Sequence, residues 1–230
     1  FAIAELIYHG VSLEKIHEVT MITPYFLEAI KNIIDMEEKL RVNKDAATLS
    51  AAKKMGFSDK YIARLWNCNE IDVYNMRKEN NLFPVFKMVD TCHTNAYIPY
   101  FYSSYTGENT SRLTDKKKII VLGAGPIRIG QGVEFDYSTV HAVTTIKKSG
   151  YEAIIINNNP ETVSTDYTTG DKINFEPLTV EDTMNVIEFE KPLGVIASLG
   201  GQTAINLAGK LTEYGVKIIG TDFEAIEKAE

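Results

Sequence analysis

One short segment constrains the fold of this chain more than any other. Four apolar residues, 119–122, favour a buried β-strand, and a glycine-rich turn begins at once with Gly123. Glycines in a strand-to-helix turn allow the backbone to approach another group closely. The turn departs from the dinucleotide-binding fingerprint, because Arg128 stands where a third glycine is required and Pro126 lacks an N–H. The segment therefore predicts a strand–turn–helix unit that fits a nicotinamide site poorly.

The pattern of this unit repeats to the end of the chain. Short apolar runs alternate with helical patterns, and a capping box at 221–224 opens a last helix. The apolar runs are 119–122, 153–156, 195–197 and 216–219, and the helical patterns lie near 136–148, 180–189 and 202–213. This alternation predicts a Rossmann-like parallel sheet covered on both faces. Because parallel strands end at one edge, the turns at 123–134, 157–162 and 200–203 are expected to meet there.

The first hundred residues carry helical rather than strand-like periodicity until Val85. Thr23-Pro24, Ser58 and Asn69 are typical of helix starts, and Gly10 of a helix end. Residues 106–115 are polar and turn-rich. The predicted fold class is therefore an all-helical N-terminal domain followed by an α/β domain, with bounds 1–105 for the helical domain, 106–116 for a linker and 117–230 for the α/β domain.

Composition excludes several classes of function. The formal net charge of -7 argues against a nucleic-acid partner. The single basic cluster, 116–118, is interpreted as a solvated strand edge. No apolar run approaches the roughly 18 residues of a membrane span, so no membrane partner is expected. Two cysteines make no disulfide framework, which favours the cytoplasm, and the four histidines show no metal-ligand spacing.

Four ordered motifs point to one family. Residues 125–137 resemble the signature that opens a synthetase half of the carbamoyl phosphate synthetase large subunit, and 157–167, 175–179 and 200–203 follow in the order of that family. Residues 12–17, 26–38 and 89–105 resemble its oligomerization domain, which joins the two halves. Ala124 and Ile127 depart from the glycine and asparagine that many relatives carry. The α/β part would then be the pre-ATP-grasp domain of the second, carbamate-phosphorylating half.

The resemblance implies a ligase. The family makes carbamoyl phosphate from bicarbonate, glutamine-derived ammonia and two ATP, for pyrimidine or arginine biosynthesis. Because the chain starts at Phe1 rather than Met and stops at Glu230 within a helical pattern, we expect an internal fragment that is inactive alone. No cofactor is expected on the fragment itself, whereas the parent enzyme would use ATP, Mg²⁺ or Mn²⁺, and K⁺. The implied partners are further copies through the helical domain and a glutaminase small subunit.

The resemblance also assigns a path for carbamate between the two halves. The matching positions are Arg128, Gly132, Val133, Glu134 and Glu161. These residue types fit the role, because glycine leaves room for a ligand and arginine can hold a carboxylate with two hydrogen bonds. Buried glutamates would be costly unless they were paired or served a polar route. The alternative is a structural ion pair between Arg128 and a carboxylate.

A second set of residues is expected to support the glycine turn or to bind an anion. It comprises Gly200, Gly201, Gln202, Thr203 and Asp136. The first four could offer backbone donors at a helix start, or could form only a tight turn. Asp136 is interpreted as a supporting residue. No residue of the fragment is assigned a catalytic or metal-binding role.

Two other readings remain open at this point. One is a nicotinamide-dinucleotide-binding Rossmann protein with a helical extension, and the other is a purely structural interaction module. A shielded Arg128 and Glu134 that face an open cleft would argue against the second.

Overall fold

The computed structural model of the chain describes residues 1–90, 96–126 and 132–229. It divides into two compact units, Phe1–Phe83 and Pro84–Glu230. The expected site residue Arg128 falls outside the described residues, as does Cys92 of the motif near the end of the helical domain. Within the described residues the first unit is helical and the second contains a six-stranded sheet, so the predicted fold class is confirmed.

Helix caps set the boundaries in the first unit. Its helices are α1 (Ala2–Tyr8), α2 (Leu13–Thr20), α3 (Pro24–Val42), α4 (Ala46–Lys54), α5 (Asp59–Trp66) and α6 (Glu70–Glu79). The Ser58 hydroxyl accepts the Tyr61 N–H at the start of α5, and Asn69 forms a capping box with Asp72 at the start of α6. Pro24 opens α3, although the Thr23 side chain makes no cap bond.

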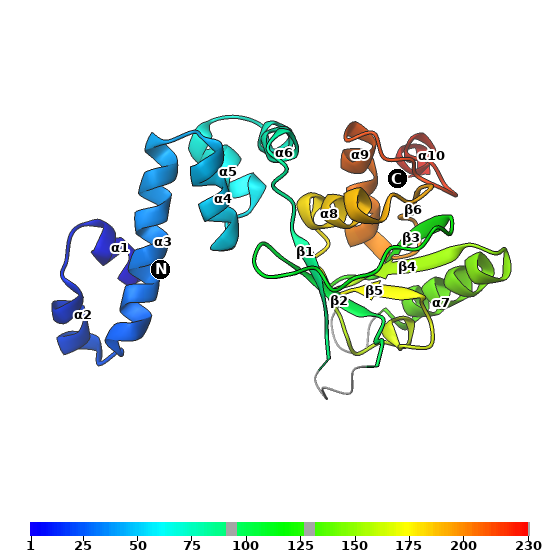
Figure 1. Cartoon of the computed structure of the whole chain (residues 1–230), viewed down its shortest axis with the longest axis horizontal. Helices are drawn as coiled ribbons and strands as arrows, with labels where there is room; N and C mark the ends of the chain where they lie inside the picture. The colour runs from blue at the N-terminus through cyan, green and yellow to red at the C-terminus, as the bar shows by residue number, and fades with distance from the viewer. Residues whose placement is uncertain (91–95, 127–131, 230) are drawn as a thin grey trace. The chain divides into compact units, whose positions relative to one another are not determined.

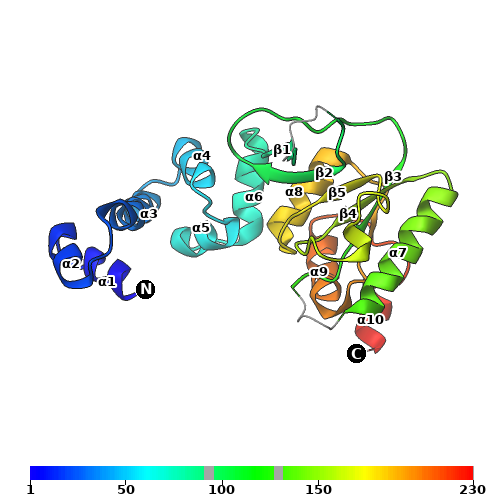
Figure 2. The same cartoon turned by 90° about the horizontal axis from the view of Figure 1, so that it is seen from below.

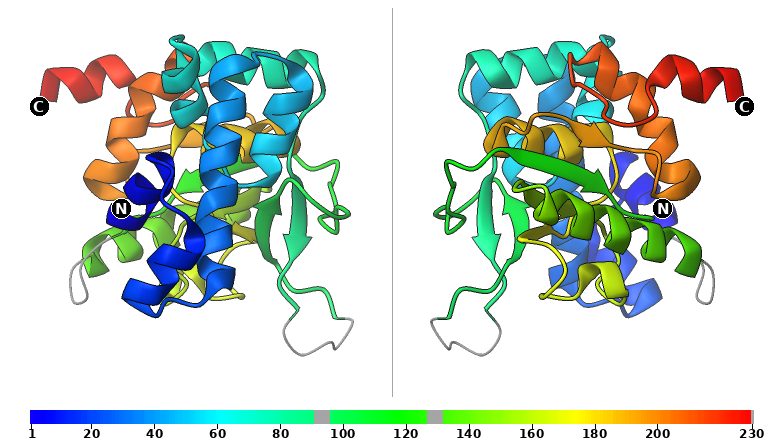
Figure 3. Two further views of the ribbon diagram at one scale, coloured as in Figure 1. Left: turned by 90° about the vertical axis from the view of Figure 1, so that its left-hand side faces the viewer. Right: turned by 90° about the vertical axis from the view of Figure 1, so that its right-hand side faces the viewer.

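The long helix α3 separates two packing environments within this unit. Leu27, Ile34 and Leu40 are buried on α3, and the indole N–H of Trp66 donates to the Leu40 carbonyl at 2.8 Å. Figure 3 shows α1 and α2 beside α3. Because α1 buries no residue of its own, this end of the unit leaves apolar surface exposed.

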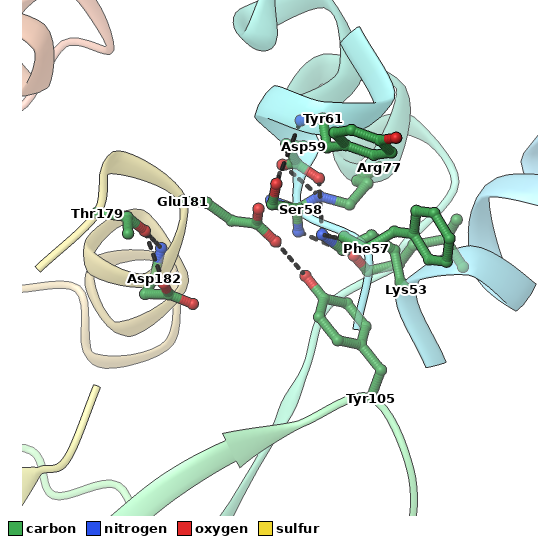
Figure 4. Close-up of polar contacts among 11 residues, drawn as sticks. Lys53, Phe57, Ser58, Asp59, Tyr61, Arg77, Tyr105, Thr179, Glu181 and Asp182 are labelled. Atoms are coloured by element: carbon green, nitrogen blue, oxygen red, sulfur yellow. Dashed lines mark hydrogen bonds and ion pairs between the residues drawn. The ribbon is translucent and has the colours of Figure 1, made fainter. Parts of the chain in front are cut away.

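A buried ion cluster joins α4, α5 and α6. The Asp59 carboxylate lies 3.0 Å from Lys53 Nζ and 2.6 Å from an Arg77 guanidinium nitrogen (Figure 4). Lys53 also donates to the Phe57 carbonyl at 2.7 Å. Because a buried charge is costly without partners, these bonds fix the relative positions of the three helices.

The second unit is a mixed sheet with helices on both faces. The strands are β1 (Val85–Met88), β2 (Tyr100–Ser104), β3 (Lys118–Leu122), β4 (Glu152–Ile156), β5 (Lys172–Asn174) and β6 (Val195–Ile196), in the order β1-β2-β5-β4-β3-β6. Only the β1–β2 pair is antiparallel among these pairs. The helices are α7 (Val133–Lys148), α8 (Val180–Glu190), α9 (Gly201–Glu213) and α10 (Phe223–Ala229), with a short 3₁₀ turn η1 (Val163–Thr165). Helix α7 covers one face, and α8 and α9 cover the other (Figures 1 and 2).

The division between the units differs from the expected boundary at residue 105. Residues 84–105 belong to the sheet, because β2 pairs in parallel with β5 and places Tyr100 beside Ile173. Phe101 is fully buried there and gives this strand a core position.

Residues 106–116, expected as a linker, are held against the sheet. Asn109 Oδ1 and Thr110 Oγ1 accept the N–H groups of Phe86 and Met88 on the edge strand β1. Ser111 is buried, and its hydroxyl accepts a hydrogen bond from Lys172 Nζ at 3.0 Å. These bonds satisfy backbone N–H groups on the open edge of β1. The segment therefore covers this edge of the sheet and does not act as a linker between two domains.

In this unit one strand was missed and two local predictions were wrong. Strand β5 was not predicted, because only Ile173 in it is apolar. The run 216–219 makes a single bridge, between Val195 and Ile218, instead of a strand. Asp222 rather than Thr221 caps α10, since Asp222 Oδ1 accepts the Ala225 N–H at 2.8 Å.

Candidate functional site

The carboxyl ends of β3, β4 and β6 lie together at one edge of the sheet, as their parallel pairing requires. The chain moves from β3 to β4 on one side, and later returns to β6 on the other side of β3. Such a reversal of direction opens a crevice in which open α/β sheets bind ligands. We define the carboxyl edge as the glycine turn 123–125, the segment 157–165 after β4 and residues 200–203 at the start of α9.

Asn157 organises the glycine turn from the end of β4. Its side chain is buried, and Oδ1 accepts the N–H of Gly125 at 3.2 Å and that of Asn159 at 3.3 Å. One amide oxygen therefore fixes two turns at the carboxyl edge. Sequence reasoning did not include Asn157 among the site residues, although an asparagine directly after a buried strand is a usable signal.

The glycines of the carboxyl edge allow close packing of protein against protein. A Cβ on Gly123 would lie 2.7 Å from the Asn157 side chain, and one on Gly125 2.9 Å from Leu178. A Cβ on Gly200 would overlap the Gly123 carbonyl oxygen and lie 2.8 Å from its carbonyl carbon. The space that a side chain would take at each position is thus filled by the neighbouring element.

The first residues of α9 also contact their own unit. Gly201 has a φ of +68°, and a Cβ there would lie 3.0 Å from the Phe135 ring. Gln202 Nε2 donates to Asn206 Oδ1 at 2.9 Å along the exposed side of α9. Thr203 lies against Gly125. Packing accounts for these contacts, and an anion at this helix start stays a prediction.

Asp136 ties the first turn of α7 to the segment after β4. Its two carboxylate oxygens accept the N–H groups of Val163 and Ser164 at 2.8 and 2.9 Å. The carboxylate satisfies donors at the start of η1 that would otherwise lack partners. Asp136 therefore holds two of the expected motifs together.

The residues assigned to the carbamate path differ in exposure. Gly132 is buried and caps α7 with a φ of +95°, a conformation that favours glycine. Val133 is 73% exposed, and Glu134 and Glu161 are also exposed. Helix α7 and the 157–165 segment present both glutamates on the surface of this chain, and their assignment to the path stays a prediction. Arg128 lies outside the described residues, so its pairing stays a prediction.

A buried acid at the same edge was missed by sequence reasoning. Glu176 is 4% exposed and follows β5 by two residues, and its Oε1 accepts the Ser103 N–H from the end of β2. Burial raises the pKa of Glu176 from 4.5 to about 7; the hydrogen bonds from Ser103 lower it, and the charge of Asp182 raises it. The motif at 175–179 contains this residue, and an acid within an otherwise apolar stretch was the available signal.

Two kinds of feature are absent from the described residues. No group of three or more His, Cys, Asp or Glu side chains among them could hold a metal ion. No helix in the same part of the chain is long and apolar enough to cross a membrane.

Two families match this sequence. Residues 1–81 match the family described as the carbamoyl-phosphate synthetase large chain oligomerisation domain. Residues 115–228 match the carbamoyl phosphate synthase preATP-grasp domain. The first match ends close to the division at Phe83, and the second covers the glycine turn and every strand from β3 onward.

Proposed function

Because the chain belongs to the carbamoyl phosphate synthetase large-chain family, we propose that it supplies a self-association module and one wall of a ligand route in that ligase. Membership of this family argues against a nicotinamide-dinucleotide-binding protein. The packed glycine turn also argues against it. Convergence of separate strand ends at the carboxyl edge is the observation that carries the proposal.

The chemistry proposed for the whole large chain is the family reaction. Bicarbonate, glutamine-derived ammonia and two ATP would give carbamoyl phosphate in the cytoplasm, with a glutaminase small subunit as partner and either pyrimidine or arginine biosynthesis as the pathway. The described residues offer no set of ligands for Mg²⁺ or Mn²⁺. In line with the family reaction, we place ATP, the divalent metal and K⁺ on other parts of the large chain, and expect residues 1–230 to be inactive alone.

The helical unit is proposed to bind a second copy of itself. Large apolar side chains are exposed on and around α1, α2 and α3: Leu6, Tyr8, Val19, Met21, Tyr25, Phe26 and Ile33. Surfaces of this kind commonly mark interfaces, and most homo-oligomers are symmetric. The family description of residues 1–81 supports the same role.

Phe26→Asp is expected to weaken self-association at least about tenfold, because a buried aromatic anchor of an interface contributes well over 1 kcal/mol. Phe26 is 59% exposed, so the change should leave the fold of the unit intact. The measurement is sedimentation equilibrium over a range of concentrations. Asn32→Asp is the control, since it adds the same charge to an exposed position of α3 about 120° round the helix from Phe26. A wild-type chain that stays monomeric at high concentration would contradict the proposal.

The carbamate route is proposed to run over the first turn of α7, beside Gly132, Val133 and Glu134, toward Glu161. The Asp136 bonds to Val163 and Ser164 support it, because they bring this turn next to the segment that carries Glu161. A route must exclude bulk water, so we expect the exposed side chains to be covered by other parts of the complete large chain.

Val133→Trp in the complete large chain should obstruct this route. Carbamoyl phosphate output should fall at least about fivefold, or about 1 kcal/mol, while bicarbonate-dependent ATP hydrolysis persists. Val133 is preferable to Gly132, whose φ of +95° would strain any side chain placed there. Leu193→Trp is the control, because Leu193 precedes β6 at the opposite edge and is 46% exposed. Unchanged output in Val133→Trp would favour the purely structural role.

A further inference from the structure

The segment 175–179 connects the end of β2 to the glycine turn. At its start, Glu176 accepts the Ser103 N–H, and at its end, Leu178 occupies the space beside Gly125. Thr179 then caps α8 by accepting the Asp182 N–H at 3.1 Å. Glu176 thus contacts the end of β2, and Leu178, two residues later, packs against Gly125 of the glycine turn.

The surroundings of Glu176 disfavour the ionised form of its carboxyl group. The carboxyl is buried, and the charged group that faces it among the described residues is the Asp182 carboxylate on α8. Asp182 cannot readily turn away, because Thr179 Oγ1 donates to its Oδ2 at 2.6 Å. From β2 the facing donors are the N–H and hydroxyl of Ser103.

A second polar pair lies nearby and does not compensate for this charge. The Tyr105 hydroxyl, just after β2, donates to Glu181 Oε1 on α8 at 3.5 Å (Figure 4). Helix α8 thus begins with two acids, Glu181 and Asp182, and the charge that acts on the Glu176 carboxyl is the negative charge of Asp182. Ionisation of Glu176 adds a like charge where solvent is largely excluded.

We propose that Glu176 is a proton-sensitive switch: when protonated it holds the segment 175–179 to the end of β2, and when ionised it releases that segment and loosens the packing of Leu178 on Gly125. The switch would act at the carboxyl edge whatever ligand passes over it, so it does not depend on the proposed carbamate route.

The direction of the pH effect follows from the two protonation states. The folded chain binds the Glu176 proton more tightly than the unfolded chain, because the pKa is about 7 when folded and 4.5 in its ordinary state. Stabilisation of the closed segment is therefore complete at low pH and is lost as pH rises from 4.5 to about 7. The full shift corresponds to a loss of about two orders of magnitude in the closing equilibrium.

Amide hydrogen exchange at Ser103 in the full chain tests the switch. After correction for the intrinsic pH dependence of exchange, protection of this amide should fall up to about a hundredfold between about pH 4.5 and about pH 7.5, with most of the fall complete by about pH 7. Glu176→Gln mimics the protonated form and should keep protection constant over this range. Glu213→Gln, at the exposed end of α9, should behave as the wild type.

A second variant keeps the proposal open to disproof if Glu176→Gln fails to fold. Asp182→Asn retains an oxygen for the Thr179 contact but removes the facing charge, so the loss of protection should be smaller and should end at lower pH. A wild-type amide whose protection does not change with pH would overturn the proposal. So would an equal loss of protection in Glu176→Gln, because that variant has no carboxyl proton to lose.

Discussion

Gly200→Ala should prevent stable folding of the sheet unit, at a cost of at least about 3 kcal/mol. The added Cβ would overlap the Gly123 carbonyl oxygen and lie 2.7 Å from the Ala204 Cβ. No rotamer can relieve this contact, because alanine has no side-chain torsion and the neighbour is backbone of the other turn. Urea denaturation followed by far-UV circular dichroism should show a large loss of cooperative signal.

Gly150→Ala is the matched control in the same unit. Gly150 has a φ of +82° and nothing within 4 Å of the position that a Cβ would take, so alanine there meets strain but no clash. Gly150→Ala should lower the free energy of unfolding by about 1 kcal/mol. Gly200 is not in the left-handed region, with a φ of -95°, so the cost of alanine there comes from the clash and not from backbone strain. Equal costs for the two variants would refute the packing explanation of the carboxyl edge.

The single tryptophan provides a reporter for the other unit. Trp66 is buried in the helical unit, and its indole donates to the Leu40 carbonyl. We expect its fluorescence transition to be retained in Gly200→Ala, since the substitution touches only the sheet unit. Loss of the Trp66 transition would mean that the two units unfold together.

Much of the fold could be predicted because local signals agreed with the tertiary structure. The apolar runs 119–122 and 153–156 form β3 and β4, and the pattern near 180–189 forms α8. Ser58 and Asn69 cap the helices that follow them. In these places periodicity, capping and burial all favour the same structure.

The failures occur where burial is decided by partners distant in sequence. The charge pattern favours a solvated strand edge for Lys118, yet this residue is buried because Glu190 lies 3.0 Å from its Nζ. Strand β5 was missed for the same reason, since its Lys172 is buried against Glu190 as well. A single sequence gives no indication that one glutamate, at the end of α8, will pair with two lysines on separate strands.

Prediction of the candidate site was limited in the same way, by contacts between residues distant in sequence. Convergence of the strand ends followed from parallel topology alone, and the carboxyl edge contains all three turns. Exposure of Glu134 and burial of Glu176 did not follow, because both depend on how helices cover the sheet. The polar residues 106–116 resembled a linker, since their bonds to β1 and Lys172 involve residues far along the chain.

Glu190→Ala is expected to destabilise the sheet unit by about 3 to 5 kcal/mol, the range found when one partner of a buried ion pair is removed. The Glu190 carboxylate lies 2.5 Å from Lys172 Nζ and 3.0 Å from Lys118 Nζ, and all three side chains are at most 5% exposed. Its removal leaves two buried ammonium groups without their anion. Glu213→Ala, on the exposed end of α9, should change the free energy of unfolding by less than about 0.5 kcal/mol.

A triple variant separates the loss of charge balance from the loss of packing. Lys118→Met, Lys172→Met and Glu190→Leu together replace the ion cluster by apolar side chains of similar volume, which is often neutral or stabilising. We expect this variant to recover most of the stability that Glu190→Ala loses in urea denaturation. The Phe101 and Phe189 ring centroids lie 5.4 and 5.8 Å from Lys172 Nζ, so methionine at 172 would retain aromatic neighbours. If the triple variant were as unstable as Glu190→Ala, the bonds from Lys172 to Ser111 and Arg112, rather than charge balance, would be what holds this edge of the sheet.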